Sequence, residues 1–376
     1  MNIAISKDSS IPLHTQLLNE LRHRVLSGEW PVGSNVPSEH TLQTQLGISR
    51  STIRQALNAA KAEGLIETVP GKGAFVSQRQ SKSSRLIGFI IPYFRSSFDS
   101  QLLKGAESAL RERDYRIVFC SSESQVREED RLLRLLVRDQ VAGVLIWPVM
   151  GDDANRFLFD LARQAVPIAL IDRTVTGLEA DVVLCDNFRG GYLATQHLIA
   201  LGHRRIVFLC RPHLNLLPIA ERLRGYRQAM HDARLELLDP LFIGEQQEIR
   251  SDYALRSYTD ASGEDIRQIR RCLAPAQCAT AIFTMNDLMA MQVLRAAELE
   301  GVKIPHELSV VGFDDLDFVS HLSVPLTTVA QDPFALGHEA ARRLMERIEG
   351  IKSRPRQIIL PTQLVVRAST AAPSLL

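Results

Sequence analysis

The sequence predicts a two-domain protein, with a small α+β head followed by a large α/β body that contains parallel sheets. Two observations lead to this fold class. Helical patterns followed by a hairpin signal fill the first eighty residues, and apolar strand-like runs alternate with helical patterns from residue 86 onward. We expect a head at 1–78, a linker at 79–85 and a body at 86–371.

The head is predicted to be a winged helix-turn-helix. Leucine and valine residues recur at helical spacing up to Gly28, and Ser38 and Ser49 stand where each can cap a further helix. The segment "LIETVPGKGAFV" then places two β-prone runs around a Pro-Gly turn. Two capped helices joined by a short turn and followed by a hairpin form a winged helix, in which the third helix can enter a major groove.

The start of the third predicted helix carries DNA-binding chemistry. Arg50 and Arg54 lie four residues apart and so share one helical face, where either can contact a guanine edge or a phosphate. Hydroxyls and helix N-terminal amides are suited to phosphate oxygens, and the predicted hairpin tip brings its backbone and one lysine close to DNA. The residues in these positions are Ser49, Ser51 and Thr52 on the helix and Gly71, Lys72 and Gly73 on the tip.

Charge is distributed unevenly along the chain. Residues 1–85 hold ten Lys and Arg against six Asp and Glu, while the remainder holds 34 against 37, so a basic head precedes a slightly acidic body. A polyanionic partner of the head fits this balance.

The stretch "VPSEHTLQTQLGISRSTIRQALNAAKAEGLIETVPGKGAFV" resembles the GntR-type winged helix of bacterial transcription regulators. The resemblance implies double-stranded DNA as the partner and adds Ser38, Glu39 and His40 to the DNA-facing set. The family commonly has arginine at the position of His40, so this contact and the preferred DNA sequence are expected to differ here. The following segment "SQRQSKSSR" is polar and predicted to be a flexible tether rather than a helix.

The body alternates buried strand patterns such as "LIGFIIP", "VPIALID" and "SVVGFDD" with helices, which predicts parallel sheets covered on both faces. Its length of nearly 290 residues predicts two similar lobes. Ligands of open parallel sheets bind beyond the carboxyl ends of strands. Polar residues follow predicted strands at Asp172, Asp186, Asn286 and Asp314, and Arg222 opens a helix. Carboxylates, an amide and a guanidinium are suited to sugar hydroxyls, although each acidic residue alone also fits a helix cap.

The markers "LIDR", "ATQHLIALGHRRI", "RLRGY", "NDLMA", "SVVGFDD" and "PLTTV" make the body resemble the effector domain of the LacI/GalR family, which has the fold of periplasmic sugar-binding proteins. The resemblance implies that Asp172, Arg222, Asn286 and Asp314 hold the effector, with Asp186 nearby. The family's first loop reads "RSSFDS" here, so Phe98 keeps an aromatic ring and Asp99 offers an added hydrogen bond. Trp147 can stack on the ligand or pack in the core, and Gln246 lies in a stretch that aligns poorly.

A GntR-type head on a LacI-type body resembles the arabinose-repressor class of chimeric regulators. We therefore expect a cytoplasmic homodimer that binds a pseudo-palindromic DNA operator and represses sugar-utilisation genes until a small carbohydrate binds. The alternatives are the same architecture responding to a non-sugar effector, such as a nucleobase or another metabolite, and a sugar-binding protein without a regulatory role. No P-loop, nucleophile elbow or zinc-protease motif appears, and the five cysteines show no metal spacing. We expect no enzymatic activity, no cofactor and no metal.

Overall fold

The computed structural model describes residues 5, 12–26, 28–70, 72–77, 84–149, 156–164, 166–212, 214, 216–244, 264–272, 279–351 and 353–374. The chain divides into two compact units, Met1–Arg85 and Leu86–Leu376. Most of the predicted linker 79–85 lies outside the described residues.

The described residues of the first unit form three helices and a two-stranded antiparallel hairpin, as the sequence predicted. Its elements are α1 (Leu13–Leu26), α2 (Glu39–Leu46), α3 (Arg50–Ala62), β1 (Ile66–Val69) and β2 (Gly73–Val76). Leu17 and Leu21 of α1 pack with Ile53 and Ala56 of α3, and all four are fully buried. This small core fixes α3 while leaving its other face toward solvent.

Serine side chains begin α2 and α3. Ser38 Oγ accepts a hydrogen bond from the Thr41 amide, and Ser49 Oγ accepts one from the Thr52 amide, each at 3.2 Å. Gly47 ends α2 with φ of 61°, a left-handed conformation that glycine adopts without strain. The predicted caps are therefore confirmed, and they set the tight turn between the two helices.

The second unit consists of two lobes, each built on a six-stranded sheet. The first sheet is wholly parallel and has the order β13-β7-β6-β5-β3-β4. Its strands are β3 (Leu86–Ile91), β4 (Arg116–Ser121), β5 (Gly143–Ile146), β6 (Ile168–Ile171), β7 (Asp181–Cys185) and β13 (Gln357–Leu360). β5, β6 and β7 are buried throughout, which explains their unbroken apolar sequences.

The second sheet has the order β14-β12-β11-β10-β8-β9. Its strands are β8 (Ile206–Cys210), β9 (Leu241–Phe242), β10 (Ala281–Thr284), β11 (Ser309–Asp314), β12 (Thr327–Ala330) and β14 (Gln363–Val365). All pairs are parallel except β12 with β14, which is antiparallel. The prediction of two lobes with parallel sheets is thus confirmed, with one antiparallel edge strand.

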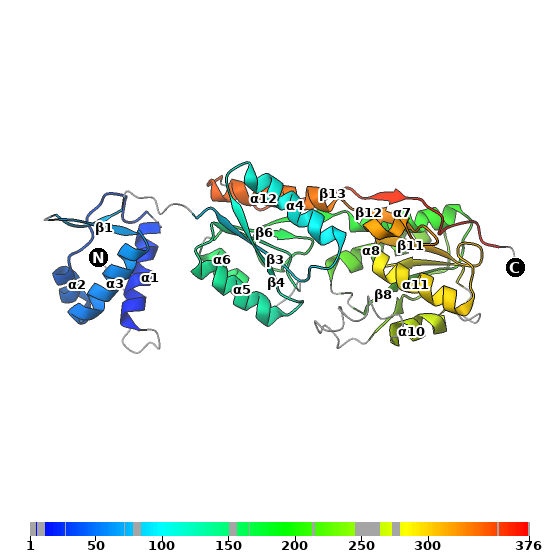
Figure 1. The fold of residues 1–376 in the computed structure, drawn as a ribbon, viewed down its shortest axis with the longest axis horizontal. Coiled ribbons are helices and arrows are strands. Elements are labelled where there is room, and N and C mark those ends of the chain that lie inside the picture. The colour runs from blue at the N-terminus through cyan, green and yellow to red at the C-terminus, as the bar shows by residue number, and fades with distance from the viewer. Residues whose placement is uncertain are drawn as a thin grey trace. The chain divides into compact units, whose positions relative to one another are not determined.

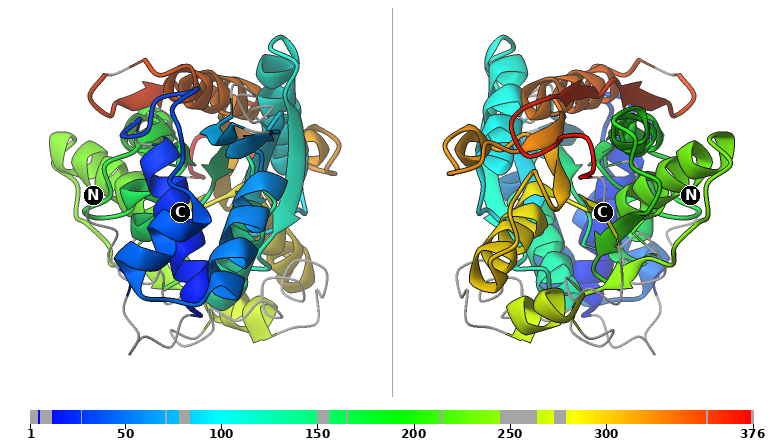
Figure 2. Two further views of the ribbon diagram at one scale, coloured as in Figure 1. Left: turned by 90° about the vertical axis from the view of Figure 1, so that its left-hand side faces the viewer. Right: turned by 90° about the vertical axis from the view of Figure 1, so that its right-hand side faces the viewer.

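Helices cover both faces of each sheet. Figure 1 shows α4 and α12 side by side on one face of the first sheet, with α5 and α6 on the other. In the second lobe α7 packs against α8 and α10 packs against α11, the latter pair visible in the right-hand view of Figure 2. The helices are α4 (Ser97–Arg111), α5 (Val126–Arg138), α6 (Arg156–Arg163), α7 (Asn187–Ala200), α8 (Leu217–Asp232), α10 (Glu264–Cys272), α11 (Asp287–Glu300), α12 (Pro333–Ile348) and the short η2 (Asp317–Ser320).

The chain passes between the lobes three times, because α12 and β13 return to the first lobe after the second has formed. The crossings follow β7, β12 and β13.

Glycines allow close helix contacts in both lobes. A Cβ on Gly105 of α4 would lie 2.0 Å from the Phe334 carbonyl oxygen, and one on Gly191 of α7 would lie 2.2 Å from the Arg222 carbonyl oxygen.

Candidate functional site

The N-terminal end of α3 is exposed, as a DNA-reading helix requires. Arg50 is its first residue, and its side chain points into solvent without a hydrogen bond to any described residue. Ser49 Oγ lies 2.8 Å from Ser51 Oγ and 2.7 Å from Thr52 Oγ1, in addition to capping the helix. The Ser49 hydroxyl is therefore already occupied, while the exposed Ser51 and the helix amides are better placed for phosphate.

Arg54 pairs with Glu39 across the turn. Arg54 Nε and Nη2 donate to the two Glu39 carboxylate oxygens at 3.1 and 3.0 Å. The hydrogen bond from Arg54 lowers the pKa of the Glu39 carboxyl, so the acid stays ionised. Both residues were predicted from the sequence to face DNA, but their pairing with each other was not predicted.

The hairpin tip is described only in part, because Gly71 lies outside the described residues. Lys72 is exposed, and Gly73 opens β2 with φ of 107°, a conformation that favours glycine. His40 is exposed on the first turn of α2. These residues keep the surface positions that the sequence predicted for them.

Arg222 on α8 is a buried arginine with several partners. It is 7% exposed, donates from Nε to Asn187 Oδ1 at 2.8 Å and from Nη1 to the Met285 carbonyl oxygen at 2.5 Å. Its Cζ lies 3.7 Å from the centre of the Phe313 ring. These partners lie at the start of α7, directly after β10 and on β11, and they hold the guanidinium plane in one orientation.

Two aspartates from different lobes lie near this guanidinium. Asp314 Oδ1 is 3.6 Å from Arg222 Nη2, and Arg222 also acts electrostatically on Asp172. Asp172 follows β6 with φ of 64° and Asp314 ends β11 with φ of 113°, so both strands end in sparsely populated backbone conformations. Such outliers gather at functional sites, and here they bring one carboxylate from each lobe to one arginine.

Burial controls the protonation of these acids. It raises the pKa of Asp314 to about 6, against the opposing effects of the Arg222 charge and of the hydrogen bond that Gln331 Nε2 donates at 2.7 Å. Burial also raises the pKa of Asp172, against the charges of Arg173 and Arg222. The site is therefore a weakly solvated group of charges in which a polar ligand meets little competing water.

A third acid, Asp287, lies behind Asp314 and was not predicted. It is fully buried, accepts from Thr328 Oγ1 at 2.5 Å and from the Leu316 amide at 2.9 Å, and burial with the Asp314 charge raises its pKa. Gly312 leaves room for it, since a Cβ there would lie 2.1 Å from Asp287 Oδ1. The "ND" of "NDLMA" was the available signal, but only the packing distinguishes a buried Asp287 from a surface cap.

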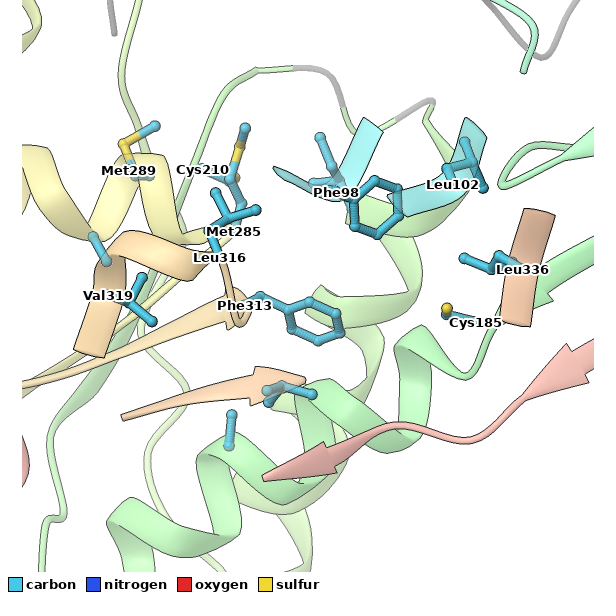
Figure 3. Packing of buried hydrophobic residues seen from close by; sticks show 14 of the residues in the cluster. Phe98, Leu102, Cys185, Cys210, Met285, Met289, Phe313, Leu316, Val319 and Leu336 are labelled. Carbon is cyan, nitrogen blue, oxygen red and sulfur yellow. The ribbon is translucent and has the colours of Figure 1, made fainter. Parts of the chain in front are cut away.

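The first lobe contributes aromatic rings and groups without partners. Trp147 is 5% exposed, and its ring lies 5.8 Å from that of Phe98. Its Nε1 makes no hydrogen bond of ordinary length, although it lies close enough to Asp172 to help lower the pKa of that carboxyl. Phe98 of this lobe and Phe313 of the other belong to one buried cluster and appear on either side of the region where the lobes meet (Figure 3).

Asp99 combines a structural role with an unused oxygen. Its Oδ2 accepts from the amides of Arg95 and Ser96 and from Ser96 Oγ, which begins α4 with a capping box. Its Oδ1 is buried without a hydrogen bond to any of the described residues, and Asp99 acts electrostatically on Asp314. Arg173 was not predicted; it anchors the same region by donating to the carbonyl oxygens of Pro148 and Val149.

Asn286 and Asp186 both serve as helix caps. Asn286 Oδ1 accepts from the Met289 amide at the start of α11, and Asp186 Oδ1 accepts from the Arg189 amide at the start of α7. Asn286 directly follows Met285, and Asp186 directly precedes Asn187. Both Met285 and Asn187 accept a hydrogen bond from Arg222. The capping interpretation therefore holds for both, and both still border the Arg222 group. Gln246 lies outside the described residues.

A separate open hollow of about 580 Å³ lies between α4 and β4, with Leu103, Lys104, Tyr115 and Phe119 in its lining. It contains none of the predicted effector residues.

Within the described parts of the chain no group of three or more His, Cys, Asp or Glu side chains is arranged to hold a metal ion. None of the described helices is both long and apolar enough to cross a membrane.

Comparison with known proteins matches both units. Residues 13–76 match the model of bacterial regulatory proteins of the gntR family, and residues 195–370 match the periplasmic binding protein-like domain. The HTH-type transcriptional regulator DegA of Bacillus subtilis is 30% identical over 291 residues, which cover 77% of this chain and 82% of the relative. The chain belongs to the HTH-type transcriptional regulators.

Two further matches extend over this regulator. The arabinose metabolism transcriptional repressor of Geobacillus stearothermophilus is 28% identical over 374 residues, covering 97% of this chain and 99% of the relative. A LacI family transcriptional regulator from Enterococcus faecium, solved with bound ribose, superposes with a TM-score of 0.63 and 27% identity, covering 76% of this chain and 99% of that one. The HTH-type regulator described here thus joins a gntR-family head to a LacI-type body, and it is a regulator rather than an enzyme.

Proposed function

We propose that this regulator is a repressor of sugar-utilisation genes whose affinity for DNA is changed by a small sugar bound between the two lobes of its body. The observation that carries the proposal is Arg222, held in one orientation beside Asp314 of its own lobe while its charge acts on Asp172 of the other lobe. A ligand that joins Asp172 to Asp314 contacts both lobes at once, so its binding free energy depends on how the lobes are arranged.

The chemistry of the site favours a neutral polyhydroxylated ligand. Carboxylates accept from hydroxyl groups, Arg222 Nη2 donates to them, and Phe98, Trp147 and Phe313 offer ring faces for the apolar side of a sugar. Asp99 Oδ1 and Gln331 Oε1 are buried without a hydrogen bond to any described residue, Trp147 Nε1 makes none of ordinary length to those residues, and all three atoms are suited to further hydroxyls. We assign effector binding to Phe98, Asp99, Trp147, Asp172, Asp186, Arg222, Gln246, Asn286 and Asp314, and add Arg173, Phe313 and Gln331.

A pentose is the favoured size. The relative from Geobacillus stearothermophilus is named for arabinose metabolism, and the Enterococcus faecium regulator holds ribose. A nucleobase is the second candidate, because the rings of Phe98, Trp147 and Phe313 also suit a planar heterocycle. A sugar-binding protein without a regulatory role does not account for the gntR-family head at 13–76.

The DNA contacts are assigned to the head, which we take as residues 1–78 joined by a tether at 79–85 to the body at 86–371. Arg50 and Arg54 read bases or phosphates from the start of α3, and Glu39 lies on the same surface beside Arg54. The other contacts are assigned to Ser38, His40, Ser49, Ser51, Thr52, Gly71, Lys72 and Gly73. A homodimer in the cytoplasm would present two such heads to a pseudo-palindromic operator.

A thermal-shift screen of the purified protein tests the effector assignment. The panel contains L-arabinose, D-ribose, D-xylose, hexoses, sugar acids and purine bases, with Arg222→Ala beside the wild type. A ligand at 100 times its dissociation constant stabilises the folded state by about 2.7 kcal/mol, which gives a measurable shift. We expect a pentose to shift the wild type and not the variant. A purine as the only hit would replace the sugar, and an undiminished shift of Arg222→Ala would place the ligand elsewhere.

A further inference from the structure

Glu39 and Arg54 form an ion pair at the predicted DNA-facing surface of the head. We propose that Glu39 is a positioning residue that turns Arg54 into a reader of guanine, rather than a DNA-contacting residue itself. This inference rests on the proposed function, because it takes the start of α3 as the part that enters the major groove.

The geometry of the pair leaves one edge of the guanidinium available. Glu39 engages Nε and Nη2, which form the side edge, through two hydrogen bonds of 3.1 and 3.0 Å. Nη1 makes no hydrogen bond to any described residue, so the end edge formed by Nη1 and Nη2 is open. The Arg54 side chain is 63% exposed in this arrangement. Two parallel donors on an open guanidinium edge match the O6 and N7 acceptors of guanine.

The neighbouring Arg50 shows the contrast. It lies one helical turn before Arg54 on the same face and has no hydrogen-bonded carboxylate among the described residues; its charge only helps to lower the pKa of Glu39. An arginine without such a partner can move to meet a phosphate, and phosphate contacts carry no sequence information. Arg50 is therefore suited to a phosphate of the DNA backbone, and Arg54 is suited to the edge of a base.

Neither fold stability nor general DNA affinity explains Glu39. The pair is largely exposed, with 63% of the Arg54 side chain and 32% of the Glu39 side chain accessible, and exposed ion pairs contribute little to folding. A carboxylate on a surface that meets DNA also repels phosphates and so weakens binding to all sequences. What the carboxylate supplies is a fixed orientation of a long side chain before DNA arrives, which favours discrimination between bases.

The chain offers a matched control. Glu63 binds Arg22 in the same head through the same side edge, with Nε to Oε2 at 3.2 Å and Nη2 to Oε1 at 2.7 Å. Glu63 lies at the opposite end of α3, just after Ala62. Glu63→Gln removes the same charge and the same type of pair from the same domain, but at a distance from the start of α3.

The experiment selects duplexes from a random DNA pool with the full-length wild type, Glu39→Gln, Arg54→Lys and Glu63→Gln, and then titrates selected and random duplexes. We expect Glu39→Gln to lower the preference for one guanine per half-site by roughly ten-fold, within the range of a bidentate contact, while binding random DNA as well as or better than the wild type. Arg54→Lys should lose the same preference, and adding Glu39→Gln to it should change the preference no further. Glu63→Gln should keep the wild-type preference.

Three results would overturn the proposal. The first is an unchanged guanine preference in Glu39→Gln, and the second is an equal loss of affinity of Glu39→Gln for selected and random DNA, which indicates a structural role. The third is an unchanged preference in Arg54→Lys, a variant that keeps the charge and removes the fork. A wild type that selects no sequence at all would instead contradict the proposed function, and thermal unfolding of each variant verifies that the head is folded.

Discussion

The proposed role of Arg222 in binding the effector depends on neighbouring side chains that the sequence alone does not specify. The markers around "RLRGY" and the polar residues after strands predicted Arg222, Asp172 and Asp314 as a group, and the structure brings these three together. Asn187, Gln331 and Asp287 were missed, because their contacts depend on which way a side chain turns in the packed lobe. A hydrogen bond between residues 35 positions apart, such as Arg222 to Asn187, leaves no local pattern in the sequence.

Replacing Arg222 by lysine should weaken sugar binding while keeping the positive charge. Lysine cannot hold Asn187 and the Met285 carbonyl oxygen while also facing a ligand, so we expect a loss of roughly ten- to hundred-fold in affinity, the range for hydrogen bonds to charged groups. Isothermal titration with the sugar found in the thermal screen measures it. Arg224→Lys is the control, because Arg224 lies on the same helix with a 64% exposed side chain paired to Glu221. Equal losses in both variants would contradict the assignment.

The protonation of Asp314 should make the stability of the body depend on pH. Its pKa is about 6 in the folded protein and 3.8 as a free side chain, so the folded state binds the proton more tightly. The stabilisation from this proton is complete below pH 3.8, is lost as the pH rises to about 6, and stays absent above that.

Denaturation at several pH values, with wild type and Asp314→Asn compared at each, measures this difference. We expect the wild type to lose stability relative to the variant as the pH rises from about 4 to 6, and the difference to stay constant above about 7. A difference that does not vary with pH, or one that varies in the opposite direction, would show that Asp314 is ionised throughout this range.

At the scale of elements, local patterns predicted the strands and helix starts well. Ser38 and Ser49 cap their helices as expected, because capping is decided within four residues. The return of α12 and β13 to the first lobe was not predicted. Their sequences show amphipathic periodicity but not which of two similar sheets they cover, since that choice depends on contacts far along the chain. The close contact of α4 with α12 at Gly105 and Gly337 was not predicted either, because it also joins residues that are far apart in the sequence.

Gly105→Ala should destabilise the body. The new Cβ would lie 2.0 Å from the Phe334 carbonyl oxygen, so α4 and α12 must move apart, at a cost of about 1–3 kcal/mol. Denaturant unfolding measures the change. Gln101→Ala on the exposed side of α4 is the control and should leave the free energy of unfolding within about 0.5 kcal/mol of the wild type. A neutral Gly105→Ala would show that the two helices are less closely packed.

In the whole molecule, we assign DNA binding to the head and ligand binding to the body. Arg50→Ala should weaken binding to selected and random DNA alike and leave the sugar-induced thermal shift unchanged, because Arg50 lies in the head and is suited to a phosphate contact. Arg222→Ala should abolish the thermal shift and leave binding to selected DNA in the absence of sugar intact. Loss of both activities in either folded variant would contradict the division into two sites.

Titration of selected DNA with and without the sugar measures whether the ligand site communicates with the DNA site. Allosteric coupling of 1–3 kcal/mol corresponds to a change of about 5- to 150-fold in affinity. We expect saturating sugar to weaken DNA binding by the wild type within that range and to leave Arg222→Ala unaffected. A sugar that binds the wild type tightly, yet leaves its affinity for DNA unchanged, would show that the two domains act independently and that the body does not regulate the head.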